Sequence, residues 1–357
     1  MVIAWDRSQE RSTLLITLKD VAAEAGVSRS TASRALSGSP LISPQTRTAV
    51  VEAARRLGYE PNRIASALRS KQSHLIGIVL NNLINASFHT IVEVVQRRAA
   101  TEGYQVMLCI TDSDAGREES FLRVLASHGV DGLIVIGTGK NAATSNALLS
   151  NGVGVVNVIR AAADSAAPSV LASDREGAYE ATRHLLDLGH ERIGFIGGVL
   201  TTNSGRERFA GYEQALVERG IAVDEGLVER GPFDPGFGTE AVVRLLDREP
   251  RMTALFAANH EAVFGVLPAL VNAGVRLPDD LSLICHEDMP WLRCWQPAIT
   301  VVDNGARELG ELAMDLLLQQ IERGDGPASD SANGRAGRTY RVGAQLVRRE
   351  SCAPVVS

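Results

Sequence analysis

From Leu75 onward, short apolar runs alternate with longer stretches in which apolar residues recur at helical spacing. The first series of runs reads LIGIVL from Leu75, YQVMLCI from Tyr104, GLIVIG from Gly132 and VGVVNVI from Val153. Apolar runs of this length between amphipathic helices predict buried parallel strands with helices packed on the sheet. The larger part of the chain is therefore expected to be an α/β fold with doubly wound parallel sheets.

A second series of strand-like runs follows from about Ser169 and reads SVLAS, RIGFIGG, ALFAAN and LSLIC. Two such series in one chain predict two lobes with a cleft between them. The first lobe is expected at about 75–170 and 303–333, and the second at about 171–302 and 334–352. Ligands bind at the carboxyl ends of parallel strands, so the cleft is the expected ligand site.

Ahead of this alternation, residues 17–58 contain three short helical patterns with closely spaced start and stop signals. Thr17 and Asp20 have the spacing of a capping box, and the helix that they open is expected to end before Gly26. Ser28 can cap a second helix about three residues later.

The third pattern begins at Ser43, where the following Pro44 suits the first turn of a helix, and it ends at Gly58. Its apolar stripe consists of Val50, Ala53, Ala54 and Leu57. Three small helices, with one tight turn between the first two, indicate a helix-turn-helix domain over residues 17–60.

Residues 1–16 are expected to form a disordered N-terminal extension, and residues 61–74 a linker ahead of the large domain at 75–357. The linker is polar, yet three of its residues share one side of a helix: Ile64, Ala65 and Leu68.

Charge is distributed unevenly along the 357 residues, whose formal net charge is −6. Residues 1–73 carry 11 Lys and Arg against 6 Asp and Glu, whereas the rest carries 25 against 36. A basic N-terminal part on an acidic body indicates a polyanionic partner at one end only.

Targeting and metal signals are absent from the sequence. No apolar run approaches the length of a membrane span, and the N-terminus lacks the basic and apolar regions of a secretory signal, so a cytoplasmic, nucleoid-associated protein is expected. The four cysteines are scattered and are expected to be free thiols. We expect no metal and no cofactor.

The segment DVAAEAGVSRSTASRAL, from Asp20 to Leu36, resembles the DNA-reading head of the LacI family of bacterial repressors. The resemblance extends from Thr17 to Ser351 and includes ISPQTRTAVVEAARRLGYEPNRIASAL, HLLDLGHERIGFIGG, RERFAGYEQAL, RLPDDLSLICHEDMPWLRCWQPAIT and the closing QLVRRES. It implies an all-α helix-turn-helix head joined to a two-lobed, periplasmic-binding-protein-like effector domain. The implied function is transcriptional repression, with operator affinity controlled by a small molecule.

The resemblance also implies that residues Asn62 to Arg69 of the linker fold into a hinge helix on the operator, paired with its twin from a second subunit. It further implies which residues contact DNA. Arg34 matches the position that contacts a guanine, Arg29 is expected to vary with the operator, and Leu68 would be an apolar wedge in the minor groove. The expected contacts are Thr17, Ser28, Arg29, Ser30, Thr31, Ser33, Arg34, Asn62, Arg63, Ala65 and Leu68. The protein is expected to bind a pseudo-palindromic operator as a homodimer. Too little chain follows QLVRRES for a tetramer-forming zipper.

Effector contacts are expected at Asn82, Ser87, Phe88, Arg208, His260, Glu287 and Trp291. Two of these depart from the family pattern, because His260 follows Asn259 where Asp is usual and Glu287 lies where a Phe-Asp-Asp run is common. Glu287 can accept hydrogen bonds from paired hydroxyls and Trp291 can stack on a ring, so a carbohydrate inducer is the leading expectation. Arg208 could instead form a surface ion pair with Glu207 or Asp174, and Trp291 could be an ordinary packing residue.

Other classes remain as alternatives. A corepressor-dependent repressor of the purine-sensing type, a carbon-catabolite-type global regulator and an activator would use the same parts. A periplasmic solute-binding protein would need a signal peptide and would lack the DNA head. An enzyme is disfavoured, because the phosphate-loop-like IVIGTGKN lacks the required glycine at Ile134 and a zinc motif begun at His260 ends wrongly at Phe264.

Overall fold

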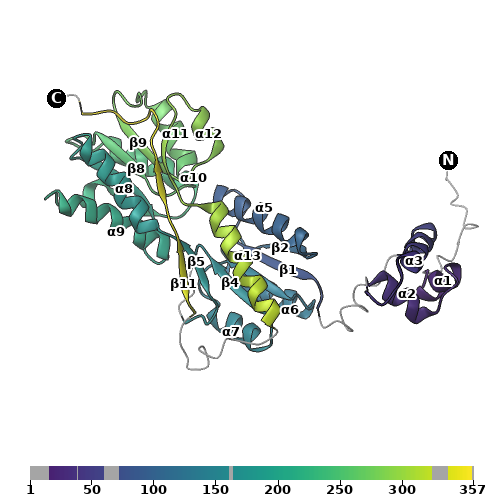
Figure 1. Ribbon diagram of the computed structural model, residues 1–357. Coiled ribbons are helices and arrows are strands. Elements are labelled where there is room, and N and C mark those ends of the chain that lie inside the picture. Colours follow the sequence, from purple (N-terminus) through teal and green to yellow (C-terminus); the bar gives the residue numbers. More distant parts are fainter. Residues whose placement is uncertain (1–15, 38, 60–71, 161–163, 324–336, 356–357) are drawn as a thin grey trace, which may run out of the picture. The chain divides into compact units, whose positions relative to one another are not determined.

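The computed structural model describes residues 16–37, 39–59, 72–160, 164–323 and 337–355. The chain divides into two compact units, Met1–Ser73 and His74–Ser357. Figure 1 shows both units.

The small unit consists of three helices, α1 (Leu18–Glu24), α2 (Arg29–Leu36) and α3 (Pro44–Leu57). The helices begin and end where the capping residues in the sequence predict. The Ser28 hydroxyl accepts the Thr31 N–H at the start of α2, and Gly58 ends α3 in the left-handed conformation, with φ of 65°. All three helices meet in one small core formed by Val21, Ala22, Ala32, Ala35, Val50, Ala53 and Ala54.

The large unit contains two six-stranded sheets, one in each lobe. The first has the order β11-β5-β4-β3-β1-β2 and is parallel throughout. Its strands are β1 (Leu75–Leu80), β2 (Gln105–Ile110), β3 (Gly132–Ile136), β4 (Gly154–Val158), β5 (Ser169–Ala172) and β11 (Thr339–Val342). The helices of this lobe are α5 (Ala86–Thr101), α6 (Ala115–Ser127), α7 (Ala142–Ser150) and α13 (Ala306–Arg323).

The second sheet has the order β12-β10-β9-β8-β6-β7, and only the β10–β12 pair is antiparallel. Its strands are β6 (Ile193–Gly198), β7 (Val228–Gly231), β8 (Ala254–Ala257), β9 (Ser282–His286), β10 (Thr300–Asp303) and β12 (Gln345–Val347). The helices of this lobe are α8 (Asp174–Asp187), α9 (Asn203–Glu218), the short 3₁₀ helix η1 (Glu225–Leu227), α10 (Pro235–Leu246), α11 (Val263–Asn272) and α12 (Pro290–Cys294).

Each sheet has an apolar core on both faces, as the run-and-helix pattern predicts. In the first lobe, α5 and α13 cover one face and α6 and α7 the other. In the second lobe, α8 and α9 pack on one face, and α10, α11 and α12 on the other. This arrangement leaves the carboxyl ends of the parallel strands as the edge where polar side chains gather.

The expected lobe boundaries need two corrections. The sequence pattern assigns β5 (169–172) to the second series, but this strand pairs with β4 and β11 in the first sheet. The expected bounds of the second lobe include β11 (339–342), but this strand also belongs to the first sheet, beside β5 (Figure 1). The chain therefore crosses between the lobes after β5, after β10 and between β11 and β12.

Candidate DNA-binding face and effector cleft

The second helix of the small unit, α2, is positioned by its N-terminal hydroxyl groups. The Ser28 Oγ accepts the Thr31 amide at 3.1 Å and lies 2.8 Å from both the Ser30 and Thr31 hydroxyl oxygens. Ala32 and Ala35 fix the buried side of α2 against the other two helices. The cap at Ser28 and the burial of Ala32 and Ala35 therefore determine which side of α2 faces away from the core.

The exposed residues of α2 are the predicted base-reading residues. Arg29, Ser30 and Arg34 are exposed, whereas Thr31 and Ser33 are half-buried. The Arg34 Nε donates to the Ser30 carbonyl at 3.2 Å, which directs the guanidinium along the helix toward its N-terminus. Arg29 has no hydrogen bond or ion pair with the described residues, so both guanidinium groups keep donors for an outside partner.

The other predicted DNA contacts divide between the described and undescribed parts of the chain. The Thr17 amide and hydroxyl both donate to the Asp20 carboxylate, at 2.8 and 2.7 Å, and these bonds lower the pKa of Asp20. This contact completes the predicted capping box and occupies the Thr17 hydroxyl. The hinge residues lie outside the described residues: Asn62, Arg63, Ala65 and Leu68.

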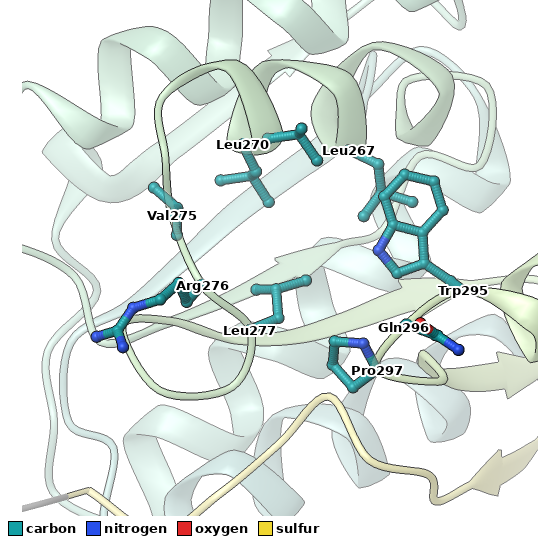
Figure 2. Close-up of a pocket in the computed structure, with 9 residues that line it drawn as sticks. Leu267, Leu270, Val275, Arg276, Leu277, Trp295, Gln296 and Pro297 are labelled. Carbon is teal, nitrogen blue, oxygen red and sulfur yellow. The ribbon is translucent and has the colours of Figure 1, made fainter.

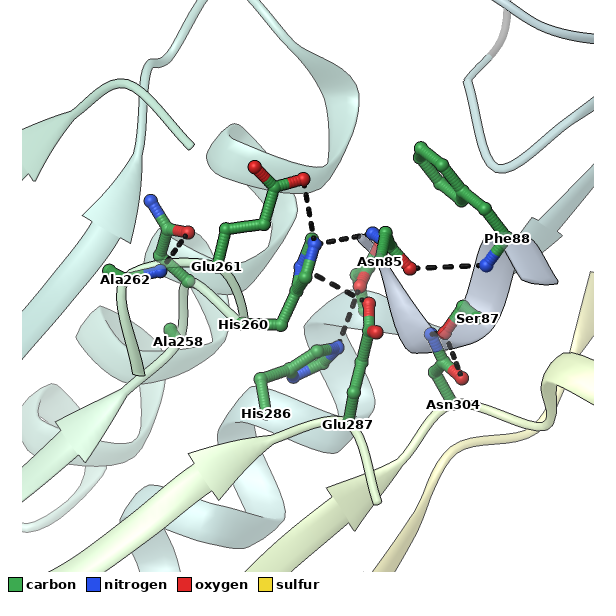
Figure 3. A network of polar contacts seen from close by, with 12 residues as sticks. Asn85, Ser87, Phe88, Ala258, His260, Glu261, Ala262, His286, Glu287 and Asn304 are labelled. Atoms are coloured by element: carbon green, nitrogen blue, oxygen red, sulfur yellow. Dashed lines mark hydrogen bonds and ion pairs between the residues drawn. The ribbon is translucent and has the colours of Figure 1, made fainter. Parts of the chain in front are cut away.

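In the large unit, polar side chains gather where strands β1, β8 and β9 end (Figure 3). The first lobe supplies Asn82 and Asn85 after β1. The second lobe supplies His260 and Glu261 after β8 and Glu287 after β9. We call these five residues the cleft cluster. The predicted positions Asn82, His260 and Glu287 are thus brought together.

Asn85 is held rigidly because it also caps α5. Its Oδ1 accepts the Phe88 amide at 3.1 Å, which fixes the orientation of the side-chain amide. The Nδ2 group consequently points across the cleft and contacts Nε2 of His260 (Figure 3).

Three further contacts join the lobes. The Asn82 Nδ2 donates to Glu261 Oε1 at 3.1 Å, and the Asn203 Nδ2 donates to the Ile159 carbonyl at 3.1 Å. The Arg160 guanidinium lies 5.6 Å from the centre of the Phe233 ring. Polar side chains therefore link the two lobes directly.

His260 lies between two carboxylates of its own lobe. Its Nε2 is hydrogen-bonded to Glu261 Oε1 at 3.3 Å. Its Nδ1 lies 3.2 Å from Glu287 Oε1, close enough for an ion pair but without hydrogen-bond alignment. Burial alone would raise the pKa of Glu261, but His260, Asn82 and Arg160 outweigh it and lower that pKa. Glu261 is therefore held as a carboxylate.

Glu287 combines backbone strain with an unused acceptor. Its φ is 73°, a region that side-chain-bearing residues rarely adopt. Its side chain is buried, and its Oε2 has no hydrogen-bond partner among the described residues. A strained, buried carboxylate with an unpartnered oxygen makes this loop a candidate binding position.

The surroundings of Arg208 differ both from the expected effector contact and from the surface ion pair. Its Nε donates to Asp174 Oδ1 at 2.7 Å and its Nη1 to the Ala258 carbonyl at 2.8 Å, in a buried site. Burial would raise the pKa of Asp174, but Arg208 and His286 outweigh it and lower the pKa to about 2. Arg208 forms the expected pair with Asp174 in the protein interior instead of on the surface.

Besides Arg208, three predicted effector residues lie outside the cleft cluster. Phe88 belongs to the apolar core of the first lobe, and the Ser87 hydroxyl exchanges hydrogen bonds with the Asn304 amide. Trp291 packs against Phe264 and Trp295, with ring centres 5.3 and 6.0 Å away. These contacts favour the packing alternative for Trp291.

Sequence reasoning missed four residues that help to form the cleft: Asn85, Arg160, Glu261 and Phe233. The position of Asn85 before a helical pattern indicates only a helix cap, and no local signal indicates its contact with His260. Phe233 lies 5.8 Å from the His260 ring, although nothing in its local sequence separates it from a core residue. Its role depends on tertiary contact alone.

A separate hollow of about 230 Å³ lies on the second lobe (Figure 2). Its apolar lining comes from α11, the loop that follows it and the segment after α12, and includes Leu267, Leu270, Leu277, Trp295 and Pro297. None of the cleft-cluster residues lines it. Within the described residues, no three His, Cys, Asp or Glu side chains are grouped to hold a metal ion, and no helix has both the length and apolarity of a membrane span.

Comparison with known proteins identifies both units. Residues 17–62 match the model of bacterial regulatory proteins of the lacI family, and residues 182–352 match a periplasmic binding protein-like domain. The HTH-type transcriptional repressor PurR of Haemophilus influenzae (strain PittEE) is 32% identical over 312 residues, which cover 87% of this chain and 93% of PurR. The chain belongs to the lacI family of bacterial regulatory proteins. It is a DNA-binding transcriptional repressor of that family.

Solved structures support the same family membership. The lac repressor dimer bound to operator and the anti-inducer ONPF has a TM-score of 0.80 and 26% identity, over 95% of this chain and 99% of that chain. The transcriptional regulator CelR in complex with cellobiose has a TM-score of 0.68 and 29% identity, over 94% and 99% of the two chains. The lacI-family fold thus extends over both units of the protein.

Proposed function

We propose that this repressor binds a pseudo-palindromic operator as a homodimer, with Arg29, Ser30 and Arg34 of α2 reading base edges. The observation that carries the proposal is the exposure of these residues on a helix whose opposite side is buried. A bidentate arginine–guanine contact contributes about 1–3 kcal/mol of discrimination. Thr17, Ser28, Thr31 and Ser33 would support this contact through the backbone geometry of α2 or through phosphates.

The test is selection of operators from a random double-stranded library, followed by affinity measurements with variants. Arg34→Ala is expected to weaken the selected operator and to relax the preference at one base pair per half-site. Arg29→Ala is expected to relax a different base pair. Arg55→Ala, which removes the same charge from exposed α3, serves as the control for a general electrostatic loss. Unchanged base preference in both α2 variants would exclude this assignment.

The hinge residues Asn62, Arg63, Ala65 and Leu68 complete the proposed DNA contacts. A leucine wedge between base pairs kinks the duplex and allows more surface to be contacted. Leu68→Ala is therefore expected to weaken operator binding without affecting effector binding. Equal operator affinity of this variant and the unmodified protein would remove the wedge from the proposal.

We infer that the effector binds in the cleft between the lobes and that it is a carbohydrate acting as inducer. Support comes from the amide and carboxylate groups of the cleft cluster, which suit hydroxyl donors, and from Phe233, which offers a ring beside His260. The relative CelR is described in complex with cellobiose. Asn82, His260 and Glu287 would contact the ligand, and Arg208 would act through the Ala258 carbonyl.

The alternative is a purine-type corepressor, which the 32% identity to a repressor named PurR supports. Operator affinity measured during titration with neutral sugars and with purine bases separates the two. An inducer lowers operator affinity and a corepressor raises it. The same titrations, followed for product formation, test the proposal that the cleft binds without catalysis in a cytoplasmic regulator.

A further inference from the structure

A strained turn at the end of β4 carries a charged side chain into the cleft. The Arg160 amide donates to the Val158 carbonyl at 2.7 Å, which closes a three-residue γ-turn, and the central Ile159 has a φ of 66°. A β-branched residue rarely adopts this conformation, and such strain persists only where the surrounding structure holds it. Asn203 of the second lobe supplies part of that support, because its Nδ2 donates to the Ile159 carbonyl. The turn places the Arg160 guanidinium over the Phe233 ring of the second lobe.

Arg160 is half-buried and has no anionic partner in the described part of the chain. Burial lowers the pKa of its guanidinium, and the buried Nε has no hydrogen-bond acceptor among the described residues. An arginine side chain stays charged and offers five N–H donors, so a position away from water without acceptors is costly. The side chain therefore requires an acceptor from outside the chain.

The two carboxylates whose charge reaches Arg160, Glu261 and Glu118, are bound to other groups. Both oxygens of the buried Glu118 accept N–H groups of the loop after β3, at 2.6 and 3.0 Å. The Oε1 atom of Glu261 accepts the Asn82 amide and is hydrogen-bonded to His260. The guanidinium consequently keeps its donor groups for a ligand in the cleft.

The opposite lobe has the complementary group, an acceptor without a donor. Glu287 is buried, and its Oε2 has no hydrogen-bond partner among the residues that the structure describes. A carboxylate accepts hydrogen bonds from hydroxyl groups, whereas a guanidinium only donates. The two sides of the cleft thus require different groups on one molecule: hydroxyl donors at Glu287 and an anionic acceptor at Arg160.

We propose that the effector is a sugar acid whose carboxylate binds Arg160 and whose hydroxyl groups bind Glu287. This assignment specifies the carbohydrate of the proposed function and rests on it. A planar carboxylate matches two parallel N–H groups of a guanidinium. A phosphate ester would bring a charge of about −1.5 to −2 into a cleft that already contains Glu261 and Glu287, so the singly charged carboxylate fits the charge balance better.

Isothermal titration calorimetry with the full chain compares matched pairs of probes. The uronates of glucose, galactose and mannose differ from the parent sugars only at carbon 6, where a carboxylate replaces the hydroxymethyl group, and glucose 6-phosphate carries a phosphate there. At least one uronate is expected to bind about tenfold or more tightly than its parent sugar, because a bidentate, charge-assisted contact is added.

Arginine variants assign this preference to one side chain. Arg160→Gln should reduce the affinity for the preferred uronate to that for the parent sugar, and should leave the affinity for the parent sugar unchanged. Arg206→Gln removes the same charge from an exposed position after β6 and should keep the full preference. A preference retained in Arg160→Gln would overturn the assignment.

Thermal unfolding without ligand tests the unpaired state of Arg160 independently of the choice of sugar. Arg160→Gln should not lower the unfolding midpoint, because it removes a desolvated charge that has no counter-ion. Arg349→Gln is the control and should lower the midpoint, since Arg349 donates to Asp288 and to the Ile299 carbonyl. Equal losses in the two variants would assign Arg160 a structural role and would overturn the inference.

The binding results also separate this inference from the proposed function. Neutral sugars that bind as tightly as every uronate, or a phosphate that binds more tightly than every uronate, would overturn the sugar acid and leave a carbohydrate effector in place. Absence of binding by all the sugars, acidic and neutral alike, would remove both proposals.

Discussion

Arg208 and Asp174 form a buried ion pair, with Nε and Oδ1 2.7 Å apart and both side chains at most 5% exposed. The same guanidinium donates to the carbonyl of Ala258, two residues before His260. The pair therefore fixes the start of the loop that carries His260 and Glu261. The contact of Arg208 with the cleft cluster is therefore indirect, through the backbone of this loop.

Asp174→Asn is expected to lower the free energy of unfolding by about 3–5 kcal/mol, because it leaves the Arg208 charge buried without its partner. Urea denaturation followed by circular dichroism measures the loss. Asp187→Asn provides the matched control, since Asp187 pairs with Arg219 on the surface, where both side chains are about half exposed. The control should lose no more than about 1 kcal/mol. Equal losses in the two variants would contradict the role given to burial.

The same pair predicts a dependence on acid. The pKa of Asp174 is lowered to about 2 in the folded protein, whereas an unfolded aspartate titrates near 3.9. The stability from this carboxylate is complete above about pH 4 and is lost as the pH falls toward 2. Denaturation midpoints measured between pH 5 and pH 2.5 should converge for the unmodified protein and Asp174→Asn. A constant difference over this range would show that Asp174 is not the group responsible.

Much of the fold could be predicted from sequence because its signals are local. Capping residues and apolar stripes located α1, α2 and α3, and buried runs located most strands. The lobe to which β5 or β11 belongs could not be predicted, since a strand at a crossover has the same local pattern in either sheet. Arg208 and Trp291 illustrate the same limit for the site, because their partners Asp174 and Phe264 lie far away in the chain.

Close packing of α10 on α11 gives a prediction that depends on a single methyl group. A Cβ atom on Gly265 would lie 1.8 Å from the Pro235 carbonyl oxygen, a backbone atom that cannot move freely. Gly265→Ala is expected to destabilise the protein by about 1–3 kcal/mol or more through overpacking. Gly343→Ala is the control, because nothing lies within 4 Å of its added methyl group. The midpoints of thermal unfolding of both variants measure the difference. An unchanged midpoint for Gly265→Ala would refute the close contact.

His190 links the C-terminal segment to the second sheet and predicts a pH effect near neutrality. Its Nδ1 lies 2.9 Å from the Thr253 hydroxyl, and its Nε2 lies 3.0 Å from both the Ser282 hydroxyl and the Ala353 carbonyl. Burial lowers the pKa of His190, and the Ala353 carbonyl opposes this shift only partly. The folded protein therefore favours the neutral imidazole.

An unfolded histidine takes up a proton near pH 6.5, so the stability contributed by His190 is complete above that pH and falls as the pH drops toward its lower folded-state pKa. His190→Gln should be less stable than the unmodified protein at pH 8, because it loses the three contacts, and the difference should shrink toward pH 5. Urea midpoints at half-unit intervals of pH measure both slopes. His128→Gln, at an exposed position, should follow the unmodified protein throughout. A difference that widens in acid would mean that the charged imidazole is the favoured form and would reverse the assignment.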